Sequence, residues 1–598
     1  MRHIHDVELL EQVGKLLGDE ARNKNVYVLF VPTEIGEDPV LSDTLGAAFV
    51  RGLQYRDSIE DNVCMMRRTL RELHLLPFQL AYPFLLRTIL REEWGFDGLT
   101  MSDWGGTYST SEAMNPGLDS EMPGPTVFWG RALSWAVSSR MVLEGARVMP
   151  HGVSSSDDPA AANTVENQVL ICRIASEGVV LLKNARNILP IKQGEKKTSA
   201  LIGNHIMNPA LGGGSSEVEL YYTVTQYDAT VEEVGREQEI FEEDPGECSH
   251  ADPLLRTTSS KNLIDIPESL RKLFIDGTES IDLWTDRPPE TGETPVLNRV
   301  SIERFADFDA LAGKPARRAI GTAATPTARI GGFEAIDEDQ AIREAAELVK
   351  VVEFLTAMTG LSIDYEYAES DRKALRLPNR LDELIEAVLS TNPNTIVVTQ
   401  SGLPIEMPWV DKEGTVLHAR FGRFSMTFSK ALRHTPVFLT FGKVDPTILY
   451  GKGVFIGHRY YEKIHHLYPM FELAKFVVLS VFEASPDHEM KVSVKVSNAG
   501  PYAGAGVVQI YVQYLTSSIQ RPIRELKGFK KVRIGVGTTA SVELRLGKYP
   551  ISFWCEEHSR WKAEQGQYVV IVERSTNPQD DVLRKSFTLE ETFYWSGL

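Results

Sequence analysis

The alternation of apolar and polar positions divides the chain into a helical N-terminal part, a middle part of alternating strands and helices, and a C-terminal β part. Residues 7–23 carry leucines and a valine at helical spacing with charges between them, which predicts an amphipathic helix. The same reasoning predicts three more helices, at about 42–52, 67–80 and 83–94. Apolar runs rich in β-formers predict two strands, at 26–31 and 99–101.

The strand predicted at 99–101 leads into the most informative stretch of this N-terminal part. It would present Asp103 and Trp104 at its C-terminal end, just before a Gly-Gly loop. Ser109–Glu112 then has the pattern of a capping box that opens a helix. A strand, an acidic residue, a glycine-rich loop and a helix form a βα unit at the catalytic face of an α/β barrel. A carboxylate beside an indole there suggests sugar chemistry; alternatively, Asp103 only satisfies loop amides.

The N-terminal part is too short for a closed barrel. A complete barrel of this type takes about 250 residues and eight strands, whereas we find two clear strands among four helices before residue 105. A linker-like segment rich in Ser, Asp and Pro begins at His151. We therefore expect an incomplete TIM-type barrel in residues 1–150.

The middle part has the pattern of a parallel α/β fold with an insertion. Residues 217–330 are turn-rich and polar with short predicted strands, which indicates an inserted β-module. The glycine-rich loop at 212–216 lacks the Lys-Ser/Thr of a phosphate cradle, which argues against nucleotide binding. Buried strands are predicted at 177–184, 199–204 and 394–399, and helices at 161–176, 337–351 and 380–389.

From about residue 475 the apolar positions recur with a period of two. Residues 491–496, 507–514 and 540–546 alternate between apolar and polar side chains, and turn residues separate them. This spacing predicts an immunoglobulin-like sandwich of about 100 residues.

Composition and charge narrow the class of function. The chain has 598 residues, of which 42% are hydrophobic and 24% charged, as in an ordinary globular protein. Its net charge of −19 is dispersed, which argues against a nucleic acid or an anionic membrane as partner and favours a neutral substrate. The first residues lack the apolar core of a signal peptide and no run has transmembrane length. We therefore expect an intracellular protein, whereas a longer natural N-terminus would allow secretion.

Cysteine and histidine positions predict neither a metal nor a cofactor. The four cysteines are far apart and form no Cys-x-x-Cys pair, so neither a disulfide framework nor a zinc site is indicated. His465 and His466 are adjacent, so they would point to opposite faces of a strand, and no carboxylate is spaced to join them.

Six stretches, in order along nearly the whole chain, resemble one enzyme family. They are Leu90–Thr110, Gly117–Gly124, Glu177–Asn184, Gln400–Trp409, Val454–Lys463 and Arg521–Phe529. Together they resemble the glycoside hydrolase family 3 β-glucosidases. Residues 273–284 are similar to the protective-antigen-type insert that one branch of this family carries.

The resemblance implies the fold class, which is α/β plus β, and a division into domains. The expected parts are a partial TIM barrel, a linker with a helix, an α/β sandwich domain in two segments, a degenerate protective-antigen-like β-module and a C-terminal fibronectin type III-like β-sandwich. Their expected ranges are 1–150, 151–176, 177–216 with 331–474, 217–330 and 475–598.

The resemblance also implies catalytic residues. The family's retaining mechanism requires two carboxyl groups about 5–5.5 Å apart, a nucleophile and an acid/base. Asp103 matches the nucleophile, and Trp104 matches an aromatic residue under the sugar on the leaving-group side. The acid/base motif matches imperfectly, because a gapless count puts Ala368 at the catalytic position. Glu369 is then the acid/base candidate and Glu366 the alternate, unless the segment is only a solvated acidic loop.

Several segments of the family pattern are absent from this sequence. They are a sugar-gripping stretch expected before Met1, an Arg-bearing loop near 33–37, a Lys-His pair expected at 54–63 and a strand expected at 81–82. Each loss removes hydrogen-bond partners from the glucose site or pairing partners from the barrel. We therefore expect a poorly stable chain with weak or absent activity.

The function expected from the resemblance is that of a retaining β-glucosidase. Its substrates would be β-glucosides or short β-glucans, from which it would remove the terminal non-reducing glucosyl residue without a cofactor. Two alternatives remain open: a non-catalytic carbohydrate-binding or scaffold protein that uses Trp104 and the β-modules, and a glycosidase of other specificity such as a β-xylosidase. A homo-oligomer is also left open.

Overall fold

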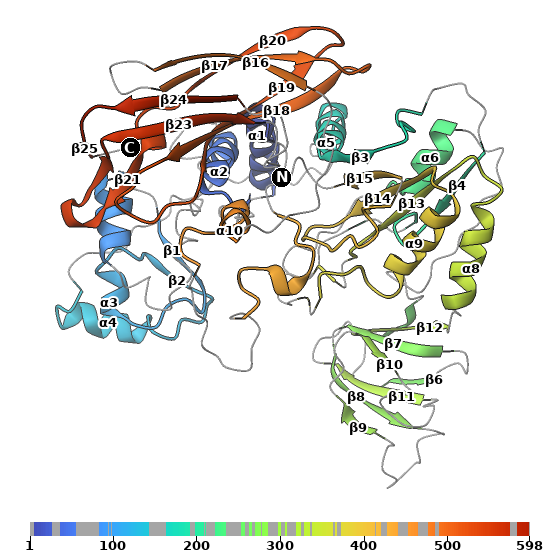
Figure 1. Ribbon diagram of the computed structural model, residues 1–598. Helices are drawn as coiled ribbons and strands as arrows, with labels where there is room; N and C mark the ends of the chain where they lie inside the picture. Colours follow the sequence, from blue (N-terminus) through green and yellow to red (C-terminus); the bar gives the residue numbers. More distant parts are fainter. Residues whose placement is uncertain are drawn as a thin grey trace.

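A computed structural model gives the arrangement of the chain (Figure 1). It describes residues 5–24, 26, 36–54, 83–93, 95–96, 99–142, 163–191, 198–207, 210, 222–234, eight strands within 253–334, then 338–362, 365–366, 372, 374–412, 414–419, 427–439, 452–464, 476–484, 490–573 and 583–596. The strand predicted at 26–31 (apart from Val26) and the helix predicted at 67–80 lie outside these residues. Within the described ranges, none of the helices combines the length and apolar character that crossing a membrane would require.

Two helices begin the chain, as the periodicity predicts. They are α1 (Val7–Asn23) and α2 (Pro39–Leu53). Asp38 caps α2 by accepting hydrogen bonds from the backbone N–H groups of Val40 and Leu41, at 2.9 and 3.3 Å. The helices touch at Gly52, where an added Cβ would lie 2.0 Å from the Glu11 carbonyl oxygen. Glycine at this crossing therefore permits the close approach of the two backbones.

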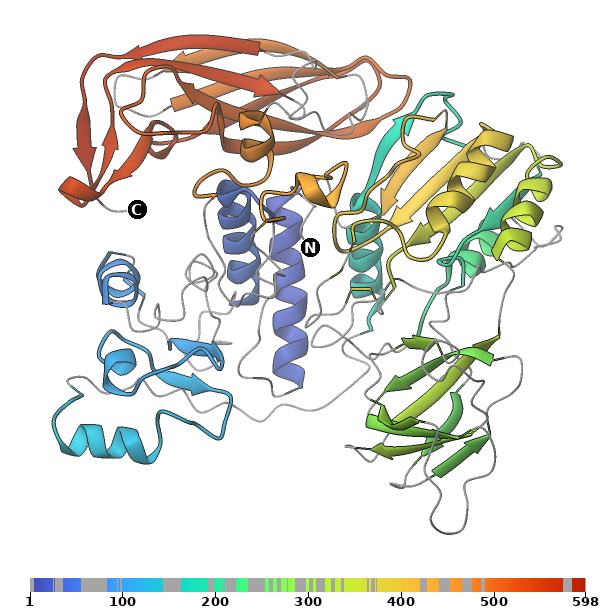
Figure 2. The same cartoon turned by 60° about the horizontal axis from the view of Figure 1, so that its bottom comes forward.

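The apolar faces of these helices are buried against the C-terminal β part. Figure 2 shows both helices directly beneath the C-terminal sheets. We call this cluster the helix–sandwich core. It consists of Leu9, Leu10, Val13, Ala21, Leu41, Leu45, Phe49, Leu53, Ile174, Val507, Tyr511, Leu526, Phe529 and Ile571. Residues from both ends of the chain thus share one hydrophobic cluster.

The next part holds a π-helix, η4 (Phe84–Glu93), at the position of a predicted helix. Two strands follow, β1 (Met101–Trp104) and β2 (Ser120–Met122), and they pair in parallel. Two short helices, α3 (Ser111–Met114) and α4 (Arg131–Ser138), accompany them. One parallel strand pair is compatible with a partial barrel, but the incomplete barrel itself stays a prediction.

The capping box predicted at Ser109–Glu112 is wrong. The N-cap of α3 is Thr110, and no side chain caps the helix. The Thr110 hydroxyl instead donates a hydrogen bond to the Phe128 carbonyl oxygen at 2.6 Å. This contact joins residues 18 positions apart, so the local motif could not reveal it.

The middle part contains a five-stranded sheet in the order β3-β15-β14-β13-β4. Strands β4, β13, β14 and β15 are parallel, and β3 is an antiparallel edge. The strands are β3 (Val179–Asn184), β4 (Ser199–Ile202), β13 (Phe354–Gly360), β14 (Thr395–Gln400) and β15 (Thr415–Ala419). The accompanying helices are α5 (Val165–Glu177), α6 (Gln226–Val234), α8 (Glu338–Leu348) and α9 (Leu381–Thr391). The predicted α/β pattern is confirmed, with element ends shifted by a few residues; α6 was not predicted.

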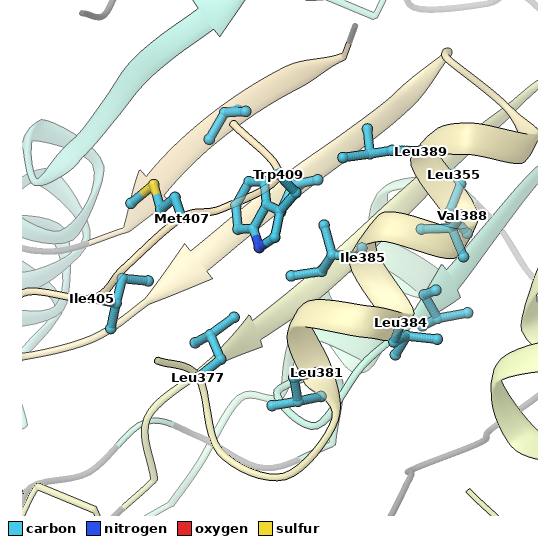
Figure 3. Close-up of a cluster of buried hydrophobic side chains, with 14 of the residues drawn as sticks. Leu355, Leu377, Leu381, Leu384, Ile385, Val388, Leu389, Ile405, Met407 and Trp409 are labelled. Atoms are coloured by element: carbon cyan, nitrogen blue, oxygen red, sulfur yellow. The ribbon is translucent and has the colours of Figure 1, made fainter. Parts of the chain in front are cut away.

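The core of this sheet forms around the fully buried Trp409. Figure 3 shows its indole between the strands and helix α9, close to Ile385 and Met407. The indole N–H donates to Asp382 at 2.9 Å, which satisfies the only polar group of the side chain. Helix α9 is thereby attached to the chain that leaves β14.

The insertion consists of two four-stranded antiparallel sheets, in the orders β10-β7-β12-β5 and β6-β11-β8-β9. Figures 1 and 2 show it next to the α/β sheet and away from the C-terminal sheets. Its strands are β5 (Pro253–Thr257), β6 (Asn262–Asp265), β7 (Leu270–Asp276), β8 (Thr278–Trp284), β9 (Leu297–Val300), β10 (Phe305–Asp307), β11 (Arg318–Ala323) and β12 (Ala328–Glu334). The β character predicted for this region is confirmed.

The C-terminal part is a β-sandwich, as the alternating pattern predicts. Its sheets have the orders β16-β17-β20, β19-β18-β23-β24 and β21-β22-β25. The strands are β16 (Phe476–Ala484), β17 (Met490–Asn498), β18 (Gly504–Tyr514), β19 (Glu525–Ile534), β20 (Thr539–Arg545), β21 (Ser552–Cys555), β22 (Arg560–Ala563), β23 (Gly566–Glu573), β24 (Leu583–Leu589) and β25 (Phe593–Trp595). We call it the C-terminal sandwich.

Buried ion pairs join three parts of the chain beside the helix–sandwich core. Asp38 pairs with Arg459 on α10 (His458–Lys463) at 3.0 Å, and both side chains are 8% exposed. Glu462 on the same helix pairs with Arg524 of the C-terminal sandwich at 2.6 Å. Arg524 also pairs with Glu573. Breaking such a pair leaves an uncompensated buried charge, so these contacts specify how the parts dock.

Replacement of Phe49 by alanine tests the helix–sandwich core. Phe49 is 2% exposed, so Phe49→Ala leaves a cavity and should lower the free energy of unfolding by about 3–5 kcal/mol. Val536→Ala, at a residue 54% exposed, is the matched control and should change it by less than about 0.5 kcal/mol. Chemical denaturation of the full chain measures both. Equal losses for the two variants would contradict the assigned core.

The free energy of unfolding should depend on pH through the buried carboxyl group of Glu573. Burial raises the pKa of Glu573 from 4.5 to about 7, although Arg524 opposes this shift. Because the folded state binds this proton more tightly than the unfolded state, the contribution of Glu573 to stability is fully present below pH 4.5 and is lost as the pH rises to about 7. Glu573→Gln should therefore reduce the fall in unfolding free energy over this interval, whereas Glu590→Gln, at an exposed position, should not. Identical pH profiles for wild type and Glu573→Gln would refute the assignment.

Candidate active site

The backbone at Asp103 is fixed by the pairing of β1 with β2. Met101 pairs with Ser120 and Trp104 with Met122, with an irregularity between the two pairs. The Ser102 hydroxyl accepts a hydrogen bond from the Met122 N–H at 2.8 Å. The predicted nucleophile position, Asp103, thus lies within β1 rather than after it. Its side chain lies outside the described part of the structure.

A buried ion pair ties this strand pair to the preceding π-helix. The Arg91 guanidinium donates to the Asp119 carboxylate at 2.7 Å, and the same Asp119 oxygen accepts the Thr100 N–H at 2.8 Å. Arg91 also donates to the Thr100 hydroxyl and to the Phe96 carbonyl oxygen, at 2.7 and 2.9 Å. Because these contacts flank β1 on its N-terminal side, the position of Asp103 depends on them.

The segment after β2 is held by another carboxylate. The buried Glu121 accepts backbone N–H groups from Val127, Phe128 and Trp129 at 2.8–3.1 Å. Trp129 is buried in a small apolar cluster with residues of η4 and α3. Trp104, in contrast, is 61% exposed at the end of β1. An exposed indole next to a strand-end carboxylate can stack on the face of a sugar ring.

The alternate acid/base residue, Glu366, lies beyond the carboxyl end of β13. Its two carboxylate oxygens accept the backbone N–H groups of Gly402 and Leu403, each at 2.6 Å. An added Cβ on Gly402 would lie 2.7 Å from a Glu366 oxygen, so glycine gives the carboxylate room. Both oxygens of Glu366 are thus engaged by the turn that follows β14.

The same turn also holds the far end of the segment that carries the acid/base candidate. Arg372 donates to the Pro404 carbonyl oxygen at 3.0 Å and to the Arg376 carbonyl oxygen at 2.9 Å. Glu369 lies between Glu366 and Arg372 in the sequence and outside the described residues. The two described ends of this segment therefore both bind the Gly402–Pro404 turn.

His205, after β4, is a residue at this sheet edge that sequence reasoning missed. It is 2% exposed, and burial lowers its pKa to about 4. A neutral imidazole is therefore held at the carboxyl edge of the parallel strands, where ligands of open α/β sheets bind. Its position directly after the strand predicted at 199–204 is the signal that could have found it.

Among the described residues, one cluster of three side chains has the spacing to hold a metal ion, and it contains Cys555, Glu557 and His558. This cluster lies in the C-terminal sandwich.

Comparison with known proteins places the chain in a family. Residues 179–422 match the glycosyl hydrolase family 3 C-terminal domain, and residues 506–576 match the fibronectin type III-like domain. The chain is 30% identical to the probable β-glucosidase I of Aspergillus fumigatus over 773 residues, covering 99% of this chain and 91% of the relative. It is also 30% identical to the probable β-glucosidase K of Emericella nidulans, covering 99% of this chain and 90% of the relative.

Solved structures of β-glucosidases also resemble this chain. The β-glucosidase from Kluyveromyces marxianus in complex with glucose superposes with a TM-score of 0.80 at 25% identity, covering 100% of this chain and 92% of that one. The alignment to the Aspergillus fumigatus relative spans 773 positions although this chain has 598 residues, so the relative contains many residues without a counterpart here.

The family predicted from the sequence motifs is thus confirmed over nearly the whole chain, together with its fold and the C-terminal fibronectin-like domain. The chain belongs to glycoside hydrolase family 3 and is, by this membership, a glycosidase of the β-glucosidase type.

Proposed function

We propose that the chain is a retaining β-glucosidase that uses Asp103 as its nucleophile. The supporting observation is that Asp103 lies in a strand fixed by β2 and by the Arg91–Asp119 ion pair, next to the exposed Trp104. In this mechanism the carboxylate attacks the anomeric carbon, forms a glucosyl-enzyme ester and expels the aglycone. Trp104 offers its indole face to the substrate on the leaving-group side.

Glucose is the sugar that we assign to the site. Curated relatives carry the name β-glucosidase, and the Kluyveromyces marxianus enzyme was solved with glucose bound. The net charge of −19 fits an uncharged substrate, since a polyanion would be repelled. We therefore propose β-glucosides and short β-glucans as substrates.

We propose Glu369 as the acid/base and assign a positioning role to Glu366. A general acid must reach the leaving-group oxygen with a free carboxyl oxygen. Both oxygens of Glu366 already accept backbone N–H groups. Glu366 and Arg372 together attach the ends of the intervening segment to the Gly402–Pro404 turn. A segment held at both ends can present Glu369 to the substrate.

We further propose that turnover is slow. The relatives contain many residues that this chain lacks. The family resemblance implies that the segments expected at 33–37 and 54–63 would carry sugar-binding groups. Each missing hydrogen bond that strengthens in the transition state raises the barrier, typically by about 1–3 kcal/mol. The same shortening favours a second candidate function, which is glucoside binding without turnover. Calorimetry that detects binding of a glucoside at which no hydrolysis occurs would support that candidate.

Replacement of Asp103 tests the nucleophile. Wild type should release nitrophenol slowly from an aryl β-glucoside, and Asp103→Asn should reduce release to background because an amide cannot form the ester. Asp411→Asn, at an exposed loop position, is the matched control and should keep the wild-type rate. Equal rates of nitrophenol release by wild type and Asp103→Asn would contradict the proposal. The corresponding aryl β-xyloside in the same assay separates glucosidase from xylosidase specificity.

Azide distinguishes the roles of Glu369 and Glu366. Glu369→Gln should lower hydrolysis by about 10²–10⁴-fold, and most strongly for substrates with poor leaving groups. Azide should partly restore its turnover of an activated aryl glucoside and yield β-glucosyl azide, because azide needs no general base. Glu366→Gln should lower hydrolysis of good and poor leaving groups alike and gain nothing from azide. Rescue of Glu366→Gln in place of Glu369→Gln would reverse the two assignments.

A further inference from the structure

A tight hairpin at one end of the C-terminal sandwich brings three metal-ligating residues together. Strands β21 and β22 pair up to Cys555 and Arg560, so only residues 556–559 connect them. This connection forms a single 3₁₀ turn, Glu556–His558, and Ser559 closes it in the left-handed conformation with φ of 47°. The turn folds His558 back over the last residue of β21. Strands β21 and β25 flank β22 in their sheet, and Figure 1 shows them near the C-terminus.

The ligand atoms have the spacing of a tetrahedral zinc site. The Cys555 Sγ lies 3.4 Å from the His558 Nδ1. Zinc bonds of about 2.3 Å to sulfur and about 2.0–2.1 Å to nitrogen, at a tetrahedral angle, place these two atoms about 3.5 Å apart. One cation can therefore bind both atoms with almost no movement of the backbone.

Glu557 supplies a third ligand. Its carboxylate oxygen lies 4.0 Å from the His558 Nδ1, and the three ligand atoms all lie within 4.8 Å of one another. The Glu557 side chain is 86% exposed, so it can rotate toward a cation without losing packing. Its negative charge and that of the metal-bound thiolate balance a divalent cation.

The residues around the hairpin pack against His558, and the nearby Lys562 is paired with a carboxylate other than Glu557. The His558 ring lies against Tyr594 of β25, with ring centroids 4.5 Å apart. The neighbouring cation, Lys562, is already paired with Glu564 at 2.8 Å. Arg560 is exposed to solvent. Sequence reasoning looked for cysteine pairs and therefore passed over this Cys-x-x-His pattern.

We propose that Cys555, Glu557 and His558 bind a zinc ion, with water as the fourth ligand. A set of one sulfur, one nitrogen and one oxygen suits Zn²⁺ and does not suit Mg²⁺ or Ca²⁺, which prefer oxygen ligands. Zinc replaces the thiol proton of Cys555, which passes to solvent. The ion closes the hairpin and thereby stabilises the C-terminal sandwich. This site is additional to the glycosidase function and does not depend on it.

The test is a zinc titration of the full chain. Isothermal titration calorimetry with ZnCl₂ should show one site in wild type and an equal site in Cys172→Ser, the matched control at an exposed cysteine outside the hairpin. Loss of a ligand should weaken this site by at least about 10–100-fold in Cys555→Ser, His558→Gln and Glu557→Gln. Saturating zinc should also raise the melting temperature of wild type and not that of Cys555→Ser.

Cobalt gives an independent readout of the ligands. Co²⁺ in place of Zn²⁺ should produce a thiolate charge-transfer band in the near ultraviolet, which Cys555→Ser abolishes and Cys172→Ser retains. Since Cys555 is half-buried, its variant can fail to fold, whereas His558 and Glu557 are exposed and their variants test the site without that risk. No zinc binding by wild type, or binding that survives in His558→Gln and Glu557→Gln, would overturn the proposal.

Discussion

The packing of the first two helices against the C-terminal sandwich is the contact on which the arrangement of the chain depends. Leu9 and Phe49 come from the first tenth of the sequence, and Tyr511 and Phe529 come from its last fifth, yet they share one cluster. The hydrophobic effect supplies most of the stability of such a cluster, at about 25 cal/mol per Å² of buried apolar surface. This cluster therefore joins the two ends of the chain.

Buried charges determine how these parts fit together. Asp38 both caps α2 and pairs with Arg459, and Glu462 on the same short helix reaches Arg524 of the sandwich. Hydrophobic packing alone tolerates sliding, whereas a buried charge is costly unless it lies against groups of opposite charge. Strand β1, which carries the proposed nucleophile, depends on a contact of the same kind, between Arg91 and Asp119. The proposed catalytic chemistry thus relies on buried ion pairs that are not themselves catalytic.

The sequence predicted secondary structure correctly where residues close together in the chain determine it. The helical period at 7–23 and the two-residue period at 491–496 correspond to α1 and β17, because each pattern reflects one buried face. The sequence prediction failed where contacts between residues far apart in the chain determine the local structure. The capping box at Ser109–Glu112 is replaced by a bond from Thr110 to Phe128, and periodicity could not distinguish a π-helix from an α-helix at Phe84–Glu93.

Some features of the candidate site could be predicted from the sequence, and others depend on contacts between distant residues. Asp103 and Trp104 could be found from the sequence only through their family motif, since a single strand-end carboxylate has many structural roles. The bonds of Glu366 to the Gly402 and Leu403 amides depend on β13 and β14 being neighbours in the sheet, which no local pattern gives. The Cys555 and His558 spacing is present in the sequence, but the 3.4 Å contact between their side chains depends on the folded hairpin.

The most direct measurement of the central proposal is the covalent intermediate. An activated 2-deoxy-2-fluoro-β-glucoside forms the glycosyl-enzyme quickly and releases it slowly, so the adduct accumulates in a retaining enzyme. Mass spectrometry of the full chain after this treatment should find one added fluoroglucosyl group, on the peptide that contains Asp103. Hydrolysis of an aryl β-glucoside without any adduct, or an adduct on another carboxylate, would contradict the account.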